Sequence, residues 1–192
     1  MNTPAHLLIG AAVMARGKPR PIVWAALIGA LLPDLSLYLL AGVSLFVLSI
    51  PPETVFNELY FSDGWQTIFA IDNSALLWGA LCLLALWRRS DWLIALSCAA
   101  LLHVILDFPL HHDDGRPHFW PISNWVFESP VSYWDRSKGA SLVAPLEAGL
   151  AVAAAIILWR QKLKPVLSFL ILALVIAELW IARQWLFVFQ VA

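Results

Sequence analysis

Residues 140–159 read ASLVAPLEAGLAVAAAIILW, an apolar run that carries a single charged side chain, Glu147. An α-helix rises about 1.5 Å per residue, so about 20 such residues cross a hydrocarbon core of roughly 30 Å. The run therefore has the length and composition of a membrane-spanning helix. Further stretches of the same character cover residues 21–45, 68–87, 92–110 and 165–189.

The composition of the whole chain also favours a membrane protein. Of its 192 residues, 61% are hydrophobic and 13% are charged, whereas soluble domains have about 45–50% and about 25%. The mean hydropathy is +0.77. These values exclude a soluble globular enzyme, and they exclude an intrinsically disordered chain, which needs low hydrophobicity. The formal net charge of −1 offers no basic field to a nucleic acid, so we expect no nucleic-acid partner.

The first apolar segment, residues 4–15, is too short to cross a bilayer. Backbone that stops at membrane depth is tolerated where other protein covers it, so we expect a half-crossing helix enclosed by its neighbours. The predicted fold class is all-α: a polytopic membrane helix bundle with five spanning helices and a short N-terminal half-crossing helix. Residues 1–192 then form a single integral membrane domain.

The distribution of basic residues predicts the orientation of this multi-pass bundle. Three short connections hold eight of the 12 Lys and Arg residues: Arg16, Lys18 and Arg20; Arg88 and Arg89; and Arg160, Lys162 and Lys164. Because these connections alternate with the spans, they share one face, and the positive-inside rule makes that face cytoplasmic. The longer connections, residues 49–67 and 111–139, then lie outside, together with the C-terminus.

Several ionisable side chains lie within the predicted spans. They are Asp34, Asp72, His103, Asp107, Glu147, Glu178 and Arg183, with His6 on the short first segment. Each costs about 2.5–3.5 kcal/mol or more at membrane depth on insertion scales, so each is a functional hypothesis. Helical rise places all of them from the middle of the membrane outward. We therefore predict one polar cavity that opens to the outer side.

His103 and Asp107 stand four residues apart in LHVILD (102–107), so they share one face of a helix. This spacing suits two ligands of one metal ion, or a carboxylate that orients an imidazole; a proton-sharing pair that joins helices is the alternative. The loop that follows contains HHDDGRPH (111–118), whose imidazoles and carboxylates match the preferences of a first-row divalent ion. His111 and His112 lie nearest the membrane, although a solvated His-rich loop would have the same composition.

Asp34 follows Pro33 in the sequence ALLPD (30–34). Proline lacks a backbone N–H, so a kink here can aim the carboxylate into the predicted cavity. Gly29 and Ala30, just before it, permit close approach of another helix.

These segments together resemble the YdjM family of bacterial inner-membrane proteins, which are described as membrane-bound metal-dependent hydrolases. The resemblance lies in His6 within PAHLL (4–8), in the Leu-Pro-Asp that ends at Asp34, and in the pair His103 and Asp107. It implies that these four residues are the metal or catalytic positions, in a protein of the bacterial inner membrane whose site faces the periplasm. Ser36 stands where the family usually has a second Asp, and residues 72–74 read DNS in place of a His-rich motif.

The sequence thus predicts a membrane-embedded metal-dependent hydrolase that acts on a lipid or amphipathic substrate. The expected ligands of a divalent ion, zinc being the first choice, are His6, His103, Asp107 and either His111 or His112. Asp34 or Asp72 is expected to act as general base or to orient a histidine, and Arg183 to hold an anionic substrate group. The alternatives are a transporter or an ion- or proton-permeation protein that uses the same buried groups, and a non-catalytic docking protein.

Overall fold

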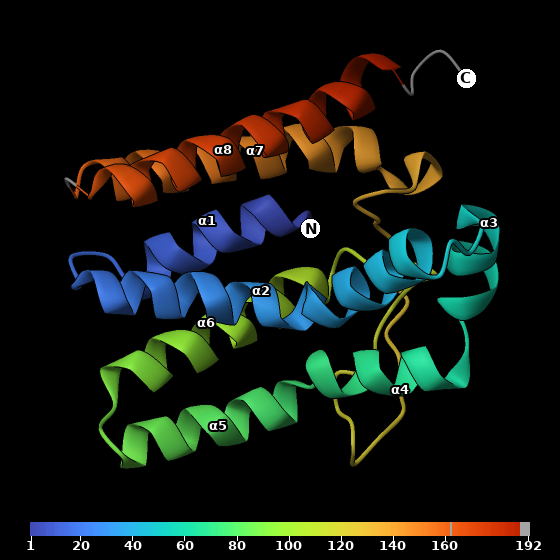
Figure 1. Cartoon of the computed structure of the whole chain (residues 1–192), viewed down its shortest axis with the longest axis horizontal. Coiled ribbons are helices and arrows are strands. Elements are labelled where there is room, and N and C mark those ends of the chain that lie inside the picture. Colours follow the sequence, from blue (N-terminus) through green and yellow to red (C-terminus); the bar gives the residue numbers. More distant parts are fainter. Residues whose placement is uncertain (162, 189–192) are drawn as a thin grey trace.

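The computed structural model describes residues 1–161 and 163–188, and over these residues the chain is helical with no strand. The α-helices are α1 (Thr3–Met14), α2 (Arg20–Gly42), α3 (Pro52–Thr54), α4 (Asp63–Asp72), α5 (Ala75–Trp87), α6 (Asp91–Asp107), α7 (Ala140–Trp159) and α8 (Pro165–Arg183). Figure 1 shows them as a bundle of roughly parallel and antiparallel rods. Short π-helical turns cover Val43–Val47, Val55–Leu59 and Gln184–Val188, and a 3-10 turn covers Arg136–Lys138. The predicted all-α class is confirmed.

Among the described residues, four helical stretches, one fewer than the five predicted, are long and apolar enough to span a membrane: Arg20–Val47, Asp63–Trp87, Ala140–Trp159 and Pro165–Leu186. The helix α6 is shorter than its predicted range of 92–110, because it ends at Asp107 and residues 108–110, which include Pro109, form a turn. Phe189, the predicted end of the last span, and Lys162 in the third basic connection lie outside the described residues.

The predicted helix over residues 68–87 is divided into α4 and α5 at Asn73 and Ser74. The Ser74 side chain accepts a hydrogen bond from the Leu77 N–H and so caps the start of α5. The Asn73 side chain donates to the backbone carbonyls of Pro33 and Phe69, at 3.2 and 3.1 Å. These side-chain hydrogen bonds take the place of backbone hydrogen bonds that an unbroken helix would have made. The bond to Pro33 also joins the break to α2.

The short helix α1 lies inside the bundle. It packs against α2 and α6 on one side and against α7 and α8 on the other, so its ribbon is enclosed in Figure 1. Most of its side chains are buried, including His6, Leu8 and Ala11. This short apolar helix therefore has the protein cover that a non-spanning helix requires at membrane depth.

Small residues bring α1, α2 and α6 into close contact. A Cβ atom added to Gly29 of α2 would lie 2.0 Å from the backbone oxygen of Leu96 on α6. One added to Gly10 of α1 would lie 2.9 Å from the Cβ of Ala30 and 3.6 Å from that of Ala99. Only glycine at Gly29 permits this crossing, which confirms the close helix approach predicted there. This close contact fixes how α1, α2 and α6 lie relative to one another, and so it fixes the positions of their polar side chains along the bundle.

The basic connections lie together at one end of the bundle, on the left of Figure 1. The Gly17 N–H donates to Oε1 of Gln161 at 3.1 Å, which joins the α1–α2 and α7–α8 connections. The Lys18 ammonium lies 3.3 Å from Asp91 at the start of α6. The predicted alternation of these connections with the long helices is thus correct.

Candidate metal centre

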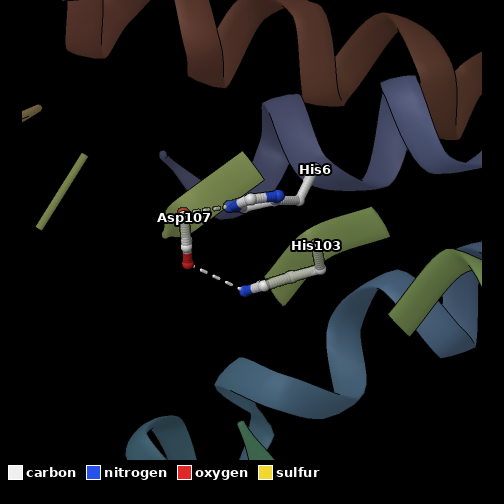
Figure 2. A group of neighbouring side chains, drawn as sticks. All are labelled: His6, His103 and Asp107. Atoms are coloured by element: carbon white, nitrogen blue, oxygen red, sulfur yellow. Dashed lines mark hydrogen bonds and ion pairs between the residues drawn. The ribbon is translucent and has the colours of Figure 1, made fainter. Parts of the chain in front are cut away.

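Three buried side chains from two helices converge in the middle of the bundle. They are His6 of α1 and His103 and Asp107 of α6, here called the ligand group, and Figure 2 shows both imidazoles directed at the carboxylate. Nε2 of His6 lies 2.8 Å from Oδ1 of Asp107, and Nε2 of His103 lies 3.1 Å from Oδ2. One donor atom of each residue lies within 4.8 Å of the other two. The predicted pair His103 and Asp107 therefore lies beside His6, as expected.

His103 is held in one tautomer by the backbone of α2. Its Nδ1 lies 2.7 Å from the carbonyl oxygen of Ala30, and because a carbonyl only accepts, Nδ1 carries the hydrogen. Nε2 of a neutral imidazole then has a free lone pair. This nitrogen is buried and makes no aligned hydrogen bond within the described part of the chain, although Asp107 is close. A metal-ligating histidine has this arrangement, in which a carbonyl fixes the ring and the other nitrogen faces the ion.

His6 lies flat against His103. The ring centroids are 3.6 Å apart and the planes differ by 10°. Both side chains are fully buried, and the Asp107 side chain is 7% exposed. Two imidazole nitrogens and a carboxylate oxygen form a donor set that zinc and related first-row ions prefer, and catalytic zinc sites commonly use three protein ligands. The residues present therefore fit a divalent ion.

Asp34 borders the ligand group from α2. Its Oδ1 lies 3.5 Å from Nε2 of His103, and its Oδ2 accepts a hydrogen bond from the Thr3 hydroxyl. Because the Thr3 hydrogen is used there, the Tyr38 hydroxyl donates to Thr3, at 2.7 Å. The Asp34 side chain is 22% exposed. It can therefore exchange a proton with the cavity beside it while remaining oriented by Thr3.

Of the two loop histidines, His111 reaches the ligand group and His112 does not. Nε2 of His111 lies 3.4 Å from Oδ2 of Asp107, and Nδ1 lies 2.9 Å from Asp114. Burial lowers the pKa of His111, but the two carboxylates outweigh burial and raise this pKa above its ordinary value. Nδ1 of His112 instead lies 2.6 Å from the Ser129 carbonyl, where it fixes the loop.

Asp72 and Arg183 lie apart from the ligand group. Asp72 ends α4 and lines a groove with Ser36 and Trp78, not the cavity beside Asp107. Arg183 is exposed at the end of α8, and its guanidinium lies 5.5 Å from the centroid of the Trp180 ring. The structure therefore does not bring together all of the residues that the sequence predicts for one site.

Two further buried carboxylates, Glu147 of α7 and Glu178 of α8, lie close to the first turn of α1. The Asn2 N–H donates to Glu147, and the Met1 amine donates to Asp107. Both carboxylate oxygens of Glu178 lack a hydrogen-bond partner among the described residues. The start of α1 therefore lies between these glutamates and the ligand group.

A cavity of about 150 Å³ opens directly beside Asp107. Its polar lining comprises Asn2, Thr3, Asp34, Tyr38, Tyr60, Asn73, Asp107, His111, Asp114, Arg116, His118 and Tyr133. We call this space the site cavity. The prediction of a polar cavity thus holds for Asp34 and Asp107, which the sequence places on different helices.

Arg116 lines the site cavity, although the sequence predicted no role for it. Its guanidinium is buried, donates to the Tyr60 hydroxyl at 2.6 Å and to Gln66 at 3.3 Å, and lies 4.4 Å from the centroid of the Phe69 ring. The available signal was the presence of an arginine inside the His-rich loop at 111–118. A loop has no helical periodicity, so the side-chain direction could not be predicted.

The chain matches no family model, no curated protein and no solved structure in the comparisons made. The ligand group and the site cavity therefore provide the evidence for function.

Proposed function

We propose that the chain is a membrane-embedded metal-dependent hydrolase that binds its substrate in the site cavity, beside one divalent metal ion. The observation that carries the proposal is the convergence of His6, His103 and Asp107, with a fixed tautomer at His103, beside a polar cavity. Buried polar groups of this kind are costly at membrane depth. The resemblance to the YdjM family, which is described as hydrolytic, supports the same reading.

The ligands in this proposal are His6, His103 and Asp107, with His111 adjacent as a fourth donor. A zinc-type ion supplies Lewis acidity, which activates water and polarises a carbonyl or phosphoryl oxygen. Asp34 is the general base, because it borders both His103 and the site cavity and is partly exposed. Thr3 orients its carboxylate through one oxygen, which leaves the other oxygen to accept the proton of water.

The membrane arrangement is part of the proposal. Five helical stretches cross the bilayer, with α6 as the shortest, and α1 crosses halfway. The basic end is cytoplasmic, since positive residues favour that side, and the site cavity then lies in the outer half, towards the periplasm of a bacterial inner membrane. A cavity at that depth favours a lipid or amphipathic substrate.

Cysteine labelling tests this orientation. In a chain whose Cys82 and Cys98 are replaced by alanine, Ile122→Cys should react with a membrane-impermeant maleimide in intact spheroplasts, because Ile122 is 84% exposed on the long loop. Arg88→Cys, at the opposite end, should react only after the membrane is permeabilised. The reverse pattern would show that the site opens to the cytoplasm.

The packing of the bundle favours hydrolysis over permeation. The bundle has an apolar core contributed by α1, α2, α6, α7 and α8, and much of it lies between the ligand group and the basic end. Ala11, Val23 and Ala99 are among its fully buried members. The buried Ser97 hydroxyl in this region donates to the Leu93 carbonyl of its own helix. An ion or proton path would need polar groups through this layer, so the site cavity is better explained as a compartment open on one side.

Metal content is the direct test of the proposal. The full chain, purified in detergent without chelator, should contain about one divalent ion per chain by elemental analysis, because three buried donors face one point. Removal of the ion should lower the unfolding temperature, and Zn²⁺ should restore it, since a ligand that binds only the native state stabilises that state. Protein that neither contains nor takes up a divalent ion would rule out the proposed chemistry.

A further inference from the structure

We infer that Arg116 binds the phosphate group of the substrate inside the site cavity, so that the substrate class is a phosphate ester. This inference rests on the proposed function, because it places the anion beside the metal ion. Arg183, which the sequence reading favoured for an anion, is exposed and lines a different groove. Arg116 is the arginine that shares a cavity with the ligand group.

Arg116 makes no direct ion pair with a carboxylate of the described residues. The residue is 9% exposed, and in the described ranges no carboxylate lies within ion-pair distance of its guanidinium. Its hydrogen-bond partners are neutral: the Tyr60 hydroxyl and the Gln66 amide oxygen. Its flat face rests near the rings of Tyr60 and Phe69, with centroids 5.0 and 4.4 Å away. A buried cation held this way is expected to pair with an anion that enters from outside the chain.

The nearest acidic group of the loop is already engaged. Asp114 lies 2.9 Å from Nδ1 of His111, and its charge also interacts with that of Arg116, although not at ion-pair distance. Asp107 belongs to the ligand group, and Asp34 accepts from Thr3. None of these carboxylates forms a direct ion pair with Arg116, although all three line the same cavity.

The chemistry of the lining favours phosphate over a planar carboxylate. Arginine offers a rigid fork of donors that matches phosphate oxygens, and a tetrahedral anion has further oxygens to direct at the ligand group. Tyr60 accepts from Arg116, so its own hydroxyl hydrogen remains available to an anion. The cavity volume of about 150 Å³ is several times the roughly 30 Å³ share of one water in the liquid. It therefore has room for a phosphate head group, while the rest of a substrate would extend beyond it.

Phosphate binding tests the inference separately from metal binding. Inorganic phosphate is titrated calorimetrically into two samples of the detergent-solubilised full chain. One sample is loaded with Zn²⁺ and then desalted, and the other is treated with chelator. We expect Arg116→Gln to weaken phosphate binding on the order of 10- to 100-fold, the loss of a charged hydrogen bond, with zinc content unchanged. Arg116→Lys keeps the charge but loses the forked donors of the guanidinium, so its phosphate affinity should lie between those of the wild-type chain and Arg116→Gln. Acetate should bind the wild-type chain at least tenfold more weakly.

The matched control is Arg88→Gln. Arg88 also lies over an aromatic ring, that of Trp87 at 5.1 Å, but at the basic end, so its loss should leave phosphate affinity unchanged. Unchanged phosphate affinity in both Arg116 variants, equal affinity for acetate, or no phosphate binding by the wild-type chain would overturn the inference. Arg116-dependent binding in a chain that holds no zinc would support the inference and overturn the proposed function instead. If dihexanoyl phosphatidic acid occupies the site at a lower concentration than inorganic phosphate does, the substrate phosphate is carried by a lipid. If inorganic phosphate binds at the lower concentration, the substrate is a soluble phosphate ester.

Discussion

Asp107→Asn should lower the affinity of the chain for Zn²⁺ by more than 100-fold. Asp107 contacts both His6 and His103 and lies 3.4 Å from His111, so its charge is the common element of the ligand group. Loss of an outer partner typically costs about 10–100-fold in metal affinity, and loss of a charged ligand should exceed that range. Competition with a chromogenic zinc chelator measures the affinity, and elemental analysis measures the content after purification.

Two variants control this prediction. Asp72→Asn removes a carboxylate of the same type that lines a different groove, and His112→Gln removes a loop histidine that hydrogen-bonds to Ser129. Both should retain zinc with affinity within a few-fold of the wild-type chain. Should Asp72→Asn lose zinc as completely as Asp107→Asn, the ligand set would have to be redrawn around α4.

Gly29→Val should prevent the chain from folding, and Gly29→Ala should destabilise it severely. The added Cβ would meet the Leu96 backbone oxygen at 2.0 Å, and backbone cannot rotate away as a side-chain tip can. Overpacking usually costs about 1–3 kcal/mol and occasionally more; we expect the upper end of that range or beyond for alanine. Separation of α2 from α6 also removes the Ala30 carbonyl from His103, so zinc content should fall with stability.

Gly79→Ala and Gly149→Ala provide the comparison, because a Cβ at either position meets no atom within 4 Å. Both should unfold at the wild-type temperature or slightly above it, since alanine favours helix over glycine. Thermal unfolding in detergent, followed by circular dichroism, measures all of these variants. A Gly29→Ala chain as stable as Gly79→Ala would mean that the α2–α6 crossing is looser than the structure has it.

The apolar runs predicted most helices well, and the errors have local causes. The range 140–159 is helical from end to end as α7, because composition alone decides a run with no polar break. The range 68–87 is divided at Asn73 and Ser74. An average of hydropathy over a long window does not detect two polar residues. The Ser74 side chain nevertheless caps α5, and the Asn73 side chain binds the backbone of α2.

Local spacing along the chain predicts the pair His103 and Asp107, but it does not predict the other residues of the site. His103 and Asp107 lie on one helix, so their proximity follows from the helical repeat alone. The position of His6 beside this pair depends on how α1 packs, which spacing along the chain does not determine; only the family resemblance made His6 an expected ligand. His112 and Arg116 lie in an irregular loop, where neighbouring residues can face opposite ways; there His112 turns to Ser129 and Arg116 enters the site cavity.

The enclosure of α1 has a consequence for biogenesis. This helix leaves the ribosome before α7 and α8, which cover one of its sides and begin at Ala140 and Pro165. A polar histidine on a helix too short to cross is poorly tolerated by lipid alone. We therefore expect newly made α1 to stay in the translocation machinery or at the membrane surface until α7 and α8 have been made.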